Sequence, residues 1–381
     1  MNDRRKILAF TATRADYPRV RSVLEEIERR PNLDLRIVAS GTHLSERFGN
    51  TVDEIERDGF TVDYRVPILT EDDTPYGMVK ACAKLVEAMA DILRDEDPDI
   101  ALITVDRFET LAVTMAAAYM NYPIAHIQGG EVTGTIDESI RHAVTKMSHL
   151  HFPANEDAAE RIRKMGEDPE RVFATGCPYI DIITRVRKKS FAELQERYSL
   201  REGAKLVLFT QHPVTTEYGD GISQVLKTID ALGRFNDVHV IALFSNADAG
   251  GRRIIERLQR ESYSIHPSIP HEDFLSLMSI ADVMVGNSSA GIREAPSFGL
   301  PVVNIGTRQA GRLRAANIID VPYEADAIAA ALERALYDGA FREACERCEN
   351  PYGTPGAAKR IVDVLESVEL NLDLLQKQIA Y

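Results

Sequence analysis

Short runs of apolar residues alternate with amphipathic stretches along most of the chain. In the first half such runs occupy residues 6–11, 35–40, 99–105, 123–127, 149–153 and 172–175. Runs of this length are typical of buried strands, and the stretches after them show the three- and four-residue apolar spacing of helices. After residue 204 the pattern restarts, with runs at 205–211, 237–243, 264–267, 282–286 and 301–305. The alternation predicts an α/β fold of two doubly wound, Rossmann-like domains.

The domain boundaries follow from where this pattern stops and restarts. The charged stretch at residues 190–204 shows no strand run, so we interpret it as the connection between domains. We expect a first domain at 1–190, a second at 191–365 and a C-terminal helix at 366–381 that packs back on the first domain. Two such domains facing one another leave a cleft at the carboxyl ends of their strands, where ligands bind in folds of this kind.

Composition narrows the class of protein. A chain of 381 residues with 44% hydrophobic and 27% charged residues is typical of a soluble two-domain protein. The net charge of -14 argues against a nucleic-acid partner, and no apolar run approaches the ~20 residues of a membrane span. The N-terminus lacks a signal-peptide pattern and the four cysteines make no disulfide framework, so we expect a cytoplasmic protein. Cys345 and Cys348 have the spacing of half a zinc site, but no second pair follows, and we predict no metal.

Ionisable residues are concentrated in the segment 126–142, which leaves an apolar run, passes two glycine breaks and enters a helical pattern near Ile136. The segment contains Glu131, Asp137, Glu138, Arg141 and His142. Loops that leave strands often carry the chemistry of an enzyme. A solvated loop followed by the acidic first turn of a helix is the simpler interpretation.

A second segment, residues 283–294, has the pattern of an anion site. It reads as a buried strand, a turn of small residues and a helix start, with Ser288 or Ser289 as the N-cap. Free main-chain N–H groups at such a start bind phosphate, and we expect Gly286 and Gly291 to let the backbone approach a ligand. Glu294 is placed one turn later, where it would accept hydrogen bonds from ribose hydroxyls. An ordinary capped helix would show the same pattern.

Four arginines follow predicted strands or turns, in loops where a diphosphate could be bound. They are Arg14, Arg107, Arg308 and Arg312. The planar guanidinium suits phosphate oxygens, although a single arginine at such a place is more often a surface ion-pair partner.

Acid and base candidates also stand at strand ends. Asp106 follows the run 99–105 and His212 follows the run 205–211, so they come from different domains and are both expected to face the cleft. Proton transfer at a sugar carbon needs such groups in place. We interpret His142, His149 and His151 as structural rather than as metal ligands, because no suitable further ligand is near in sequence.

These segments together resemble a known family. The matching stretches are 13–16, 106–109, 126–142, 211–215, 286–289 with 293–294, and 304–309, in family order. The sequence resembles the hydrolysing UDP-N-acetylglucosamine 2-epimerases of sialic acid biosynthesis. The resemblance implies the glycosyltransferase-B architecture and a two-step reaction, in which UDP is eliminated with the proton on carbon 2 and water then adds to release N-acetylmannosamine. It implies no cofactor, and a homodimer or homotetramer.

The resemblance also assigns roles to residues of this chain. UDP would be held by Arg14, Arg107, Ser288, Ser289, Glu294 and Arg308. The sugar would be surrounded by Asp106, Glu131, Asp137, Glu138, Arg141 and His212, with Gln128 and Asn246 as further substrate contacts. The stretch 136–142 resembles the hydrolysing branch, whereas the non-hydrolysing branch typically carries Pro-Glu-Glu-Ala-Asn-Arg there.

Several positions depart from the family pattern. Gln128 stands where relatives often carry histidine or glutamate, and glutamine cannot act as a base, so the base is left open among Glu131, Asp137 and Asp106. Ala12, Pro18 and Val105 replace glycines that are frequent in the family, which would alter how closely the loop approaches the ligand.

The substituents at sugar carbons 4 and 6 stay open, because related sequences act on UDP-2,4-diacetamido-2,4,6-trideoxyglucose in legionaminic acid pathways. Three alternatives stay open. The first is a non-hydrolysing epimerase, and the second is a retaining glycosyltransferase on the same scaffold, which would not need the carboxylates at residues 131–138. The third is an inactive protein that binds a sugar nucleotide, against which Asp106, Asp137, Glu138 and His212 count.

Overall fold

The computed structural model describes residues 4–72, 74–245 and 248–380, and the chain in it divides into two compact units. The first unit comprises Met1–Glu131, Ile136–Thr184 and Tyr352–Tyr381, and the second comprises Val132–Thr135 and Arg185–Pro351. The boundaries expected from sequence were residues 190 and 365. The short insertion Val132–Thr135 comes from the middle of the segment 126–142, so that segment belongs to both units.

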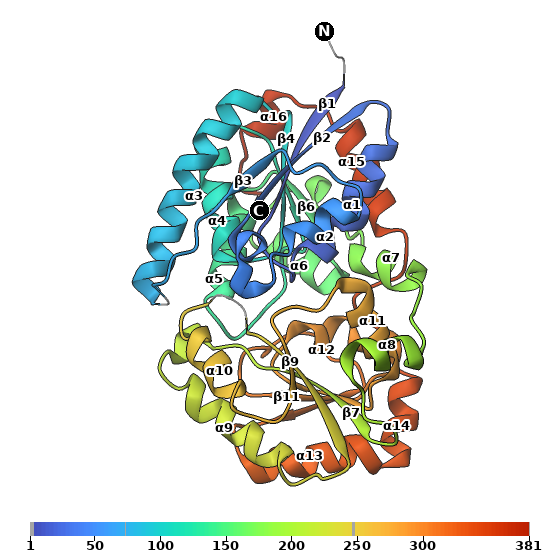
Figure 1. Cartoon of the computed structure of the whole chain (residues 1–381). Coiled ribbons are helices and arrows are strands. Elements are labelled where there is room, and N and C mark those ends of the chain that lie inside the picture. The colour runs from blue at the N-terminus through green and yellow to red at the C-terminus, as the bar shows by residue number, and fades with distance from the viewer. Residues whose placement is uncertain (1–3, 73, 246–247, 381) are drawn as a thin grey trace. The chain divides into compact units, whose positions relative to one another are not determined.

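The first unit is built on a six-stranded parallel sheet with the order β3-β2-β1-β4-β5-β6 (Figure 1). Its strands are β1 (Arg5–Thr11), β2 (Leu33–Ser40), β3 (Tyr64–Val66), β4 (Ile100–Thr104), β5 (Ile124–Ile127) and β6 (Leu150–Phe152). Successive side chains of a strand point to opposite faces. In β1, Ile7 and Ala9 therefore enter the core on one face, while Leu8 and Phe10 enter the core on the other.

Helices cover both faces of this sheet. The helices of the first unit are α1 (Tyr17–Arg29), α2 (Val52–Arg57), α3 (Pro75–Glu96), α4 (Phe108–Tyr119), α5 (Asp137–Met147), α6 (Glu156–Lys164), α7 (Pro178–Arg185), α15 (Ala357–Ser367) and α16 (Leu372–Leu375). Helices α3, α4 and α5 pack on the face of Leu8, and α1 and α15 pack on the face of Ile7. Burial on both faces explains why the strand runs are continuously apolar rather than alternating.

The end of the chain is held on the first unit by polar contacts. Arg30 forms ion pairs with Asp363 and Glu366 on α15, each at 2.7 Å. The Lys377 ammonium donates to the main-chain oxygen of Ser148, which follows α5, at 2.6 Å. A cation at the carboxyl end of α5 is favoured by the helix dipole.

The second unit repeats the architecture with the strand order β12-β11-β10-β7-β8-β9, again all parallel. Its strands are β7 (Lys205–Thr210), β8 (Val238–Leu243), β9 (Ser264–His266), β10 (Val283–Gly286), β11 (Val302–Ile305) and β12 (Ile318–Val321). Its helices are α8 (Phe191–Tyr198), α9 (Gly221–Leu232), α10 (Gly251–Leu258), α11 (His271–Ile280), α12 (Ser289–Arg293), α13 (Ala325–Tyr337) and α14 (Gly339–Glu346). Numbered along each unit, both sheets have the Rossmann order, so the prediction of two doubly wound domains is confirmed.

Some predicted elements were wrong. The strand expected at residues 172–175 is absent, because a 3-10 turn (Pro169–Arg171) leads into a single bridge between Val172 and His151. The connection expected at 190–204 contains α8, which begins with a capping box between Ser190 and Glu193. The helix whose start was predicted within residues 283–294 is short, because α12 ends at Arg293 and a 3-10 turn that contains Pro296 follows.

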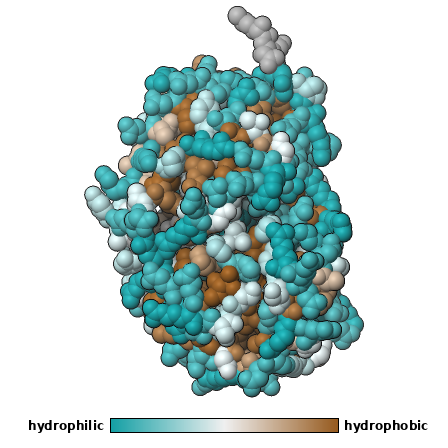
Figure 2. Space-filling model, in the orientation of Figure 1, coloured by the Kyte–Doolittle hydropathy of each residue, from teal (hydrophilic) through white to brown (hydrophobic). Residues whose placement is uncertain are grey.

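The visible surface is mostly hydrophilic (Figure 2). On the face drawn in Figure 2, hydrophilic residues predominate and apolar residues appear between them as smaller patches. Within residues 4–72, 74–245 and 248–380, none of the helices combines the length and the apolar character that a membrane crossing requires.

Candidate functional site

The predicted site residues gather at the switch point of each sheet. The strand order reverses between β1 and β4 in the first unit and between β7 and β10 in the second. In open α/β sheets, ligands bind outside the carboxyl ends of the strands at this reversal. Arg14, Asp106 and Arg107 follow β1 and β4, while His212 and Ser288 follow β7 and β10.

Arg141 connects the predicted carboxylate residues of the first unit. Its guanidinium is fully buried, and its Nε donates to the Asp106 carboxylate at 2.9 Å. Its Nη1 donates to the main-chain oxygen of Glu131 at 2.8 Å and to the Glu138 carboxylate at 2.9 Å. Burial acts to lower the pKa of Arg141, but the neighbouring carboxylates, Asp106 first, raise it above its ordinary value. A permanently charged guanidinium therefore organises this site.

The carboxylates differ in how they are held. Glu138 accepts from Arg141 and also faces Nε2 of His142 at 2.9 Å. Asp106 forms an ion pair with Arg141. Both carboxylates are thus engaged with the Arg141 guanidinium. Asp137 is the half-buried first residue of α5, where the helix dipole favours negative charge, and the Glu131 side chain is buried.

The predicted arginines of the first unit are partly withdrawn from water. Arg14 is half-buried, and burial lowers its pKa to about 10, so it stays cationic at neutral pH. The Arg107 guanidinium lies over the ring of Phe108, 5.6 Å from the centroid, with its Nε 3.5 Å from the Glu109 carboxylate. Both side chains are cationic groups next to the switch point.

Asp16, which lies with Arg14 in the stretch 13–16, has a structural role. Its carboxylate accepts from the Thr11 hydroxyl at 2.5 Å and from the Thr13 N–H at 3.0 Å, and it lies 3.8 Å from Nε2 of His43. Burial raises its pKa, yet the His43 and Thr11 contacts outweigh burial and hold it below the ordinary value. Asp16 thereby fixes the loop that carries Arg14.

Gln128 occupies a constrained position after β5. Its backbone has a φ of +66°, and its side chain is buried with Nε2 donating to the Cys177 thiol at 2.9 Å. The glycines that follow Gln128 are required by close packing, since a Cβ on Gly130 would lie 2.3 Å from the Ala158 carbonyl oxygen. The structure therefore directs the Gln128 amide toward Cys177.

Asn287 joins the strand-end loops of the second unit, and sequence reasoning missed it. Its Oδ1 accepts from the main-chain N–H of His212 at 2.7 Å, and its Nδ2 donates to the His212 carbonyl at 2.9 Å. The Asn287 carbonyl accepts from Nη1 of Arg308 at 3.3 Å and from Nε2 of Gln309 at 2.9 Å. One fully buried asparagine thus holds the loops after β7, β10 and β11 together.

Ser288 is the N-cap of α12, and its hydroxyl accepts from the Ala290 N–H at 3.3 Å. Ser289 is the half-buried first residue of that helix, and Glu294, buried, ends it. The N-cap prediction is therefore confirmed, with Ser288 in the role.

Gly286 and Gly291 are both required by packing within the protein, and the expectation that they let the backbone approach a ligand stays a prediction. Gly286 has a φ of +125°, and a Cβ there would lie 2.0 Å from the Thr210 carbonyl oxygen of β7. A Cβ on Gly291 would lie 2.8 Å from Val302 of β11.

Gly134, in the short insertion Val132–Thr135, packs against the loop that carries Arg308. The Gly134 N–H donates to the Arg308 carbonyl at 3.2 Å, and a Cβ on Gly134 would lie 2.0 Å from the Thr307 carbonyl oxygen. The insertion Val132–Thr135 belongs to the second unit, and the residues that flank it in sequence, Glu131 and Ile136, belong to the first.

The structure also bears on the remaining predictions, which concern Asn246, two histidines and Cys345. Asn246 lies outside the described residues. The imidazole Nδ1 of His149 accepts from the Ile124 N–H at 3.0 Å, and Nε2 of His151 lies 3.0 Å from the Glu167 carboxylate, so both are engaged in structural contacts. Cys345 is buried in the core of the second unit. In the described part of the chain, no group of three or more His, Cys, Asp or Glu side chains could hold a metal ion.

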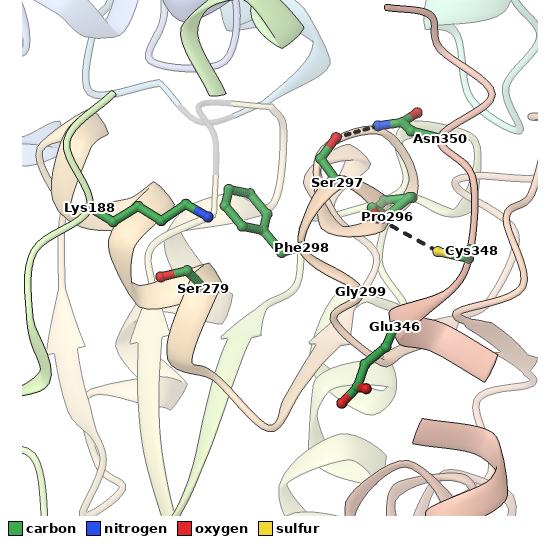
Figure 3. Close-up of a pocket in the computed structure, with 9 residues that line it drawn as sticks. All are labelled: Lys188, Ser279, Pro296, Ser297, Phe298, Gly299, Glu346, Cys348 and Asn350. Carbon is green, nitrogen blue, oxygen red and sulfur yellow. Dashed lines mark hydrogen bonds between the residues drawn. The ribbon is translucent and has the colours of Figure 1, made fainter. Parts of the chain in front are cut away.

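The second unit contains a cavity of about 370 Å³ (Figure 3). It is lined by Lys188, Ser279, Pro296, Ser297, Phe298, Gly299, Glu346, Cys348 and Asn350. The Lys188 ammonium lies over the Phe298 ring, 5.1 Å from its centroid, and the Asn350 amide donates to the Ser297 hydroxyl at 2.7 Å. Of the predicted site residues that the structure describes, none lines it.

Comparison with known proteins places the chain in a family. The family model described as UDP-N-acetylglucosamine 2-epimerase matches residues 25–366. The chain belongs to this family. Relatives include a Legionella pneumophila protein named UDP-N,N'-diacetylbacillosamine 2-epimerase (hydrolyzing), which is 36% identical over 99% of this chain and 100% of its own. A Campylobacter jejuni protein named GDP/UDP-N,N'-diacetylbacillosamine 2-epimerase (hydrolyzing) is 37% identical over 83% of this chain and 84% of its own.

Solved epimerase structures have the same fold. The crystal structure of UDP-GlcNAc 2-epimerase from Neisseria meningitidis bound to UDP-GlcNAc superposes with a TM-score of 0.81, at 22% identity, over 94% of this chain and 99% of that one. At that identity the likeness concerns the fold, and it confirms the predicted glycosyltransferase-B class.

Proposed function

We propose that this family member is a hydrolysing 2-epimerase of a UDP-linked 2-acetamido sugar. The observation that carries the proposal is the family match over residues 25–366 together with two relatives named as hydrolysing 2-epimerases at 36% and 37% identity. The acidic first turn of α5, with Asp137 next to a Glu138 that is bonded to the buried Arg141 guanidinium, supports it.

The proposed reaction has two balanced steps. In the first, a base takes the proton from sugar carbon 2 while the bond from carbon 1 to the UDP oxygen breaks, which leaves a 2-acetamidoglucal and UDP. In the second, the hydroxyl of water adds to carbon 1 and a proton returns to carbon 2 on the opposite face. The products are UDP and a free sugar of manno configuration. Both steps need positioned acid–base groups and cationic stabilisation of the departing diphosphate.

The proposal assigns one role to the carboxylates that form ion pairs with Arg141 and another role to the remaining carboxylates. Asp106 and Glu138 form ion pairs with Arg141, so they orient this guanidinium and stabilise positive charge near the sugar. Asp137 and Glu131 are then the candidates for proton transfer at carbon 2, with His212 as a further acid–base group.

For the UDP group, we propose the same binding residues that we predict from the sequence. It assigns the diphosphate to Arg14, Arg107, Ser288, Ser289 and Arg308, and the ribose to Glu294. Gln128 and Asn246 stay proposed substrate contacts. A homodimer or homotetramer is part of the same proposal, and the mass in solution, measured by light scattering, tests it.

The names of these two relatives favour a UDP-linked diacetamido sugar over UDP-N-acetylglucosamine, which we expect first from the sequence. N,N'-diacetylbacillosamine is 2,4-diacetamido-2,4,6-trideoxyglucose, and it stands in the names of both relatives. The family description names N-acetylglucosamine instead. We therefore propose the UDP-linked 2,4-diacetamido sugar as the preferred substrate and UDP-N-acetylglucosamine as the second candidate.

Release of UDP from the two sugars by purified protein, with the product sugar identified by NMR, tests the proposal. We expect turnover with a kcat/KM higher for the diacetamido sugar. Asp137→Asn is expected to lower kcat by about 10²- to 10⁴-fold with UDP affinity changed by less than about threefold. Glu156→Gln, at the first residue of α6, is the matched control and should leave kcat unchanged. An unimpaired Asp137→Asn enzyme would overturn the assignment, and a wild type inactive on both sugars would overturn the function.

A further inference from the structure

Val105, the residue before Asp106, has an unusual backbone. It follows the last residue of β4 with a φ of +62°, in the left-handed region that β-branched residues rarely adopt. The other described non-glycine residues with positive φ are Asn50, Asp97, Asn121, Gln128 and Ser199, none of them β-branched. The chain therefore holds a valine in a conformation that glycine adopts freely, and neighbouring groups must hold it there.

Strand β5 provides the restraint. The Val105 N–H donates to the Ile127 carbonyl at 3.0 Å, and the Val105 carbonyl lies 2.8 Å from Nε2 of His126. Because a carbonyl only accepts, His126 carries its proton on Nε2 and donates it to Val105. Both main-chain polar groups of the strained residue are thus bonded to two neighbouring residues of β5.

The His126 ring is itself fixed from the other side. It is fully buried, and its Nδ1 lies 3.4 Å from the Thr145 hydroxyl of α5. A Cβ on Gly129 would lie 2.8 Å from Nδ1 and 2.9 Å from that hydroxyl, so only glycine leaves room for the contact. Burial lowers the pKa of His126 to about 4, which keeps the ring neutral and its single Nε2 proton in place at neutral pH.

The elements joined by His126 are those that carry the central ion pair. Asp106 follows Val105 directly, and its partner Arg141 precedes Thr145 by one helical turn on the same face of α5. One imidazole therefore connects the backbone that aims Asp106 to the helix that presents Arg141.

We propose that His126 is a positioning residue, which holds Val105 in its strained conformation and thereby places the Asp106 carboxylate against Arg141 for the reaction. This inference rests on the proposed function, because the role of Asp106 does. His126 does not touch the substrate in this account, and the hydrogen bond to Val105 is its means of action.

A double-mutant cycle between the two residues tests the proposal. His126→Leu removes the donor and is expected to lower kcat by about 10²-fold, the cost of a misplaced catalytic group, with KM and UDP affinity changed by less than about threefold. His126→Gln places an amide N–H near the position of Nε2 and should keep kcat within about tenfold of wild type. Val105→Gly alone should leave kcat within about threefold, because glycine adopts positive φ without strain.

The combined variant decides the matter. In the Val105→Gly background, His126→Leu should cost only about tenfold in kcat, since the backbone no longer needs to be held. An equal cost of His126→Leu in both backgrounds would overturn the proposal. If His126→Leu fails to fold, the same comparison is made with His126→Gln, and a cost unaltered by Val105→Gly again overturns it. Failure of the proposed function is distinguishable, because it appears as a wild type without turnover.

Discussion

Asn287 offers the sharpest test of how the second unit presents His212. Replacing it by alanine removes two hydrogen bonds to the His212 main chain, at 2.7 and 2.9 Å, without adding bulk or charge. The carbonyl of residue 287 stays available to Arg308 and Gln309. The perturbation is therefore confined to the clamp between the loops after β7 and β10.

The size of the effect follows from the two lost bonds. Each contributes roughly 0.5–1.5 kcal/mol net, so Asn287→Ala should lower the free energy of unfolding by about 1–3 kcal/mol. Without the clamp the His212 loop is free to shift, and a displacement near 1 Å of an acid–base group costs on the order of 10²-fold in kcat. We expect both losses together in this variant.

Asn317 is the matched control. It is also fully buried in the second unit, and its Nδ2 donates to the Leu300 carbonyl at 2.7 Å. Leu300 precedes β11 and Asn317 precedes β12, so this bond lies at the amino ends of the strands, whereas the predicted site residues follow the carboxyl ends. Asn317→Ala removes one hydrogen bond, so it should lower the free energy of unfolding by about 0.5–1.5 kcal/mol in urea unfolding followed by circular dichroism, yet keep kcat within about threefold. If Asn287→Ala lost stability but kept the kcat of the Asn317→Ala control, the clamp on His212 would have no part in the reaction.

Three further predictions concern stability. Burial raises the pKa of Glu167, but hydrogen bonds from His151, Lys146 and Lys377 outweigh it and lower it to about 2. Its contribution is thus present above about pH 4.5 and lost as pH falls toward 2. Glu167→Gln should cost about 3 kcal/mol in urea unfolding at pH 7 and progressively less below pH 4.5, and a pH-independent difference would contradict this. Burial lowers the pKa of His126 to about 4, so the folded protein disfavours the protonated ring. The free energy of unfolding is therefore at its full value above pH 6.5 and falls by up to about 3 kcal/mol between pH 6.5 and 4. His126→Gln should reduce this loss when urea unfolding is measured over the same pH range. Gly286→Ala, whose Cβ would meet a carbonyl of β7 at 2.0 Å, should abolish soluble folded protein, whereas Gly339→Ala, with nothing within 4 Å, should express as wild type.

The sequence was sufficient for the features that depend on local pattern. Buried parallel strands are continuous apolar runs, so the order of strands and helices could be predicted, and with it the loops that carry Asp106 and His212. The helix start at Ser288 was predicted from its N-cap chemistry. The capping pattern of Ser190 and Glu193 was present too, but it was passed over because the surrounding stretch is highly charged.

What could not be predicted depends on strand register and long-range packing. Gly286 needs its lack of a side chain because β10 pairs with β7 and places it against Thr210. Asn287 holds His212 for the same reason, although the two are distant in sequence. Val105 was recognised as a replaced glycine, but only the backbone shows that the replacement keeps a positive φ.

The most direct test of the proposed chemistry is proton NMR of the wild-type protein turning over UDP-2,4-diacetamido-2,4,6-trideoxyglucose and UDP-N-acetylglucosamine in heavy water. Elimination followed by hydration predicts that UDP and a free sugar of manno configuration appear together, with deuterium at carbon 2 of every product molecule. An epimerised sugar still attached to UDP would contradict hydrolysis. A free sugar that keeps the gluco configuration and its original hydrogen at carbon 2 would contradict the elimination itself.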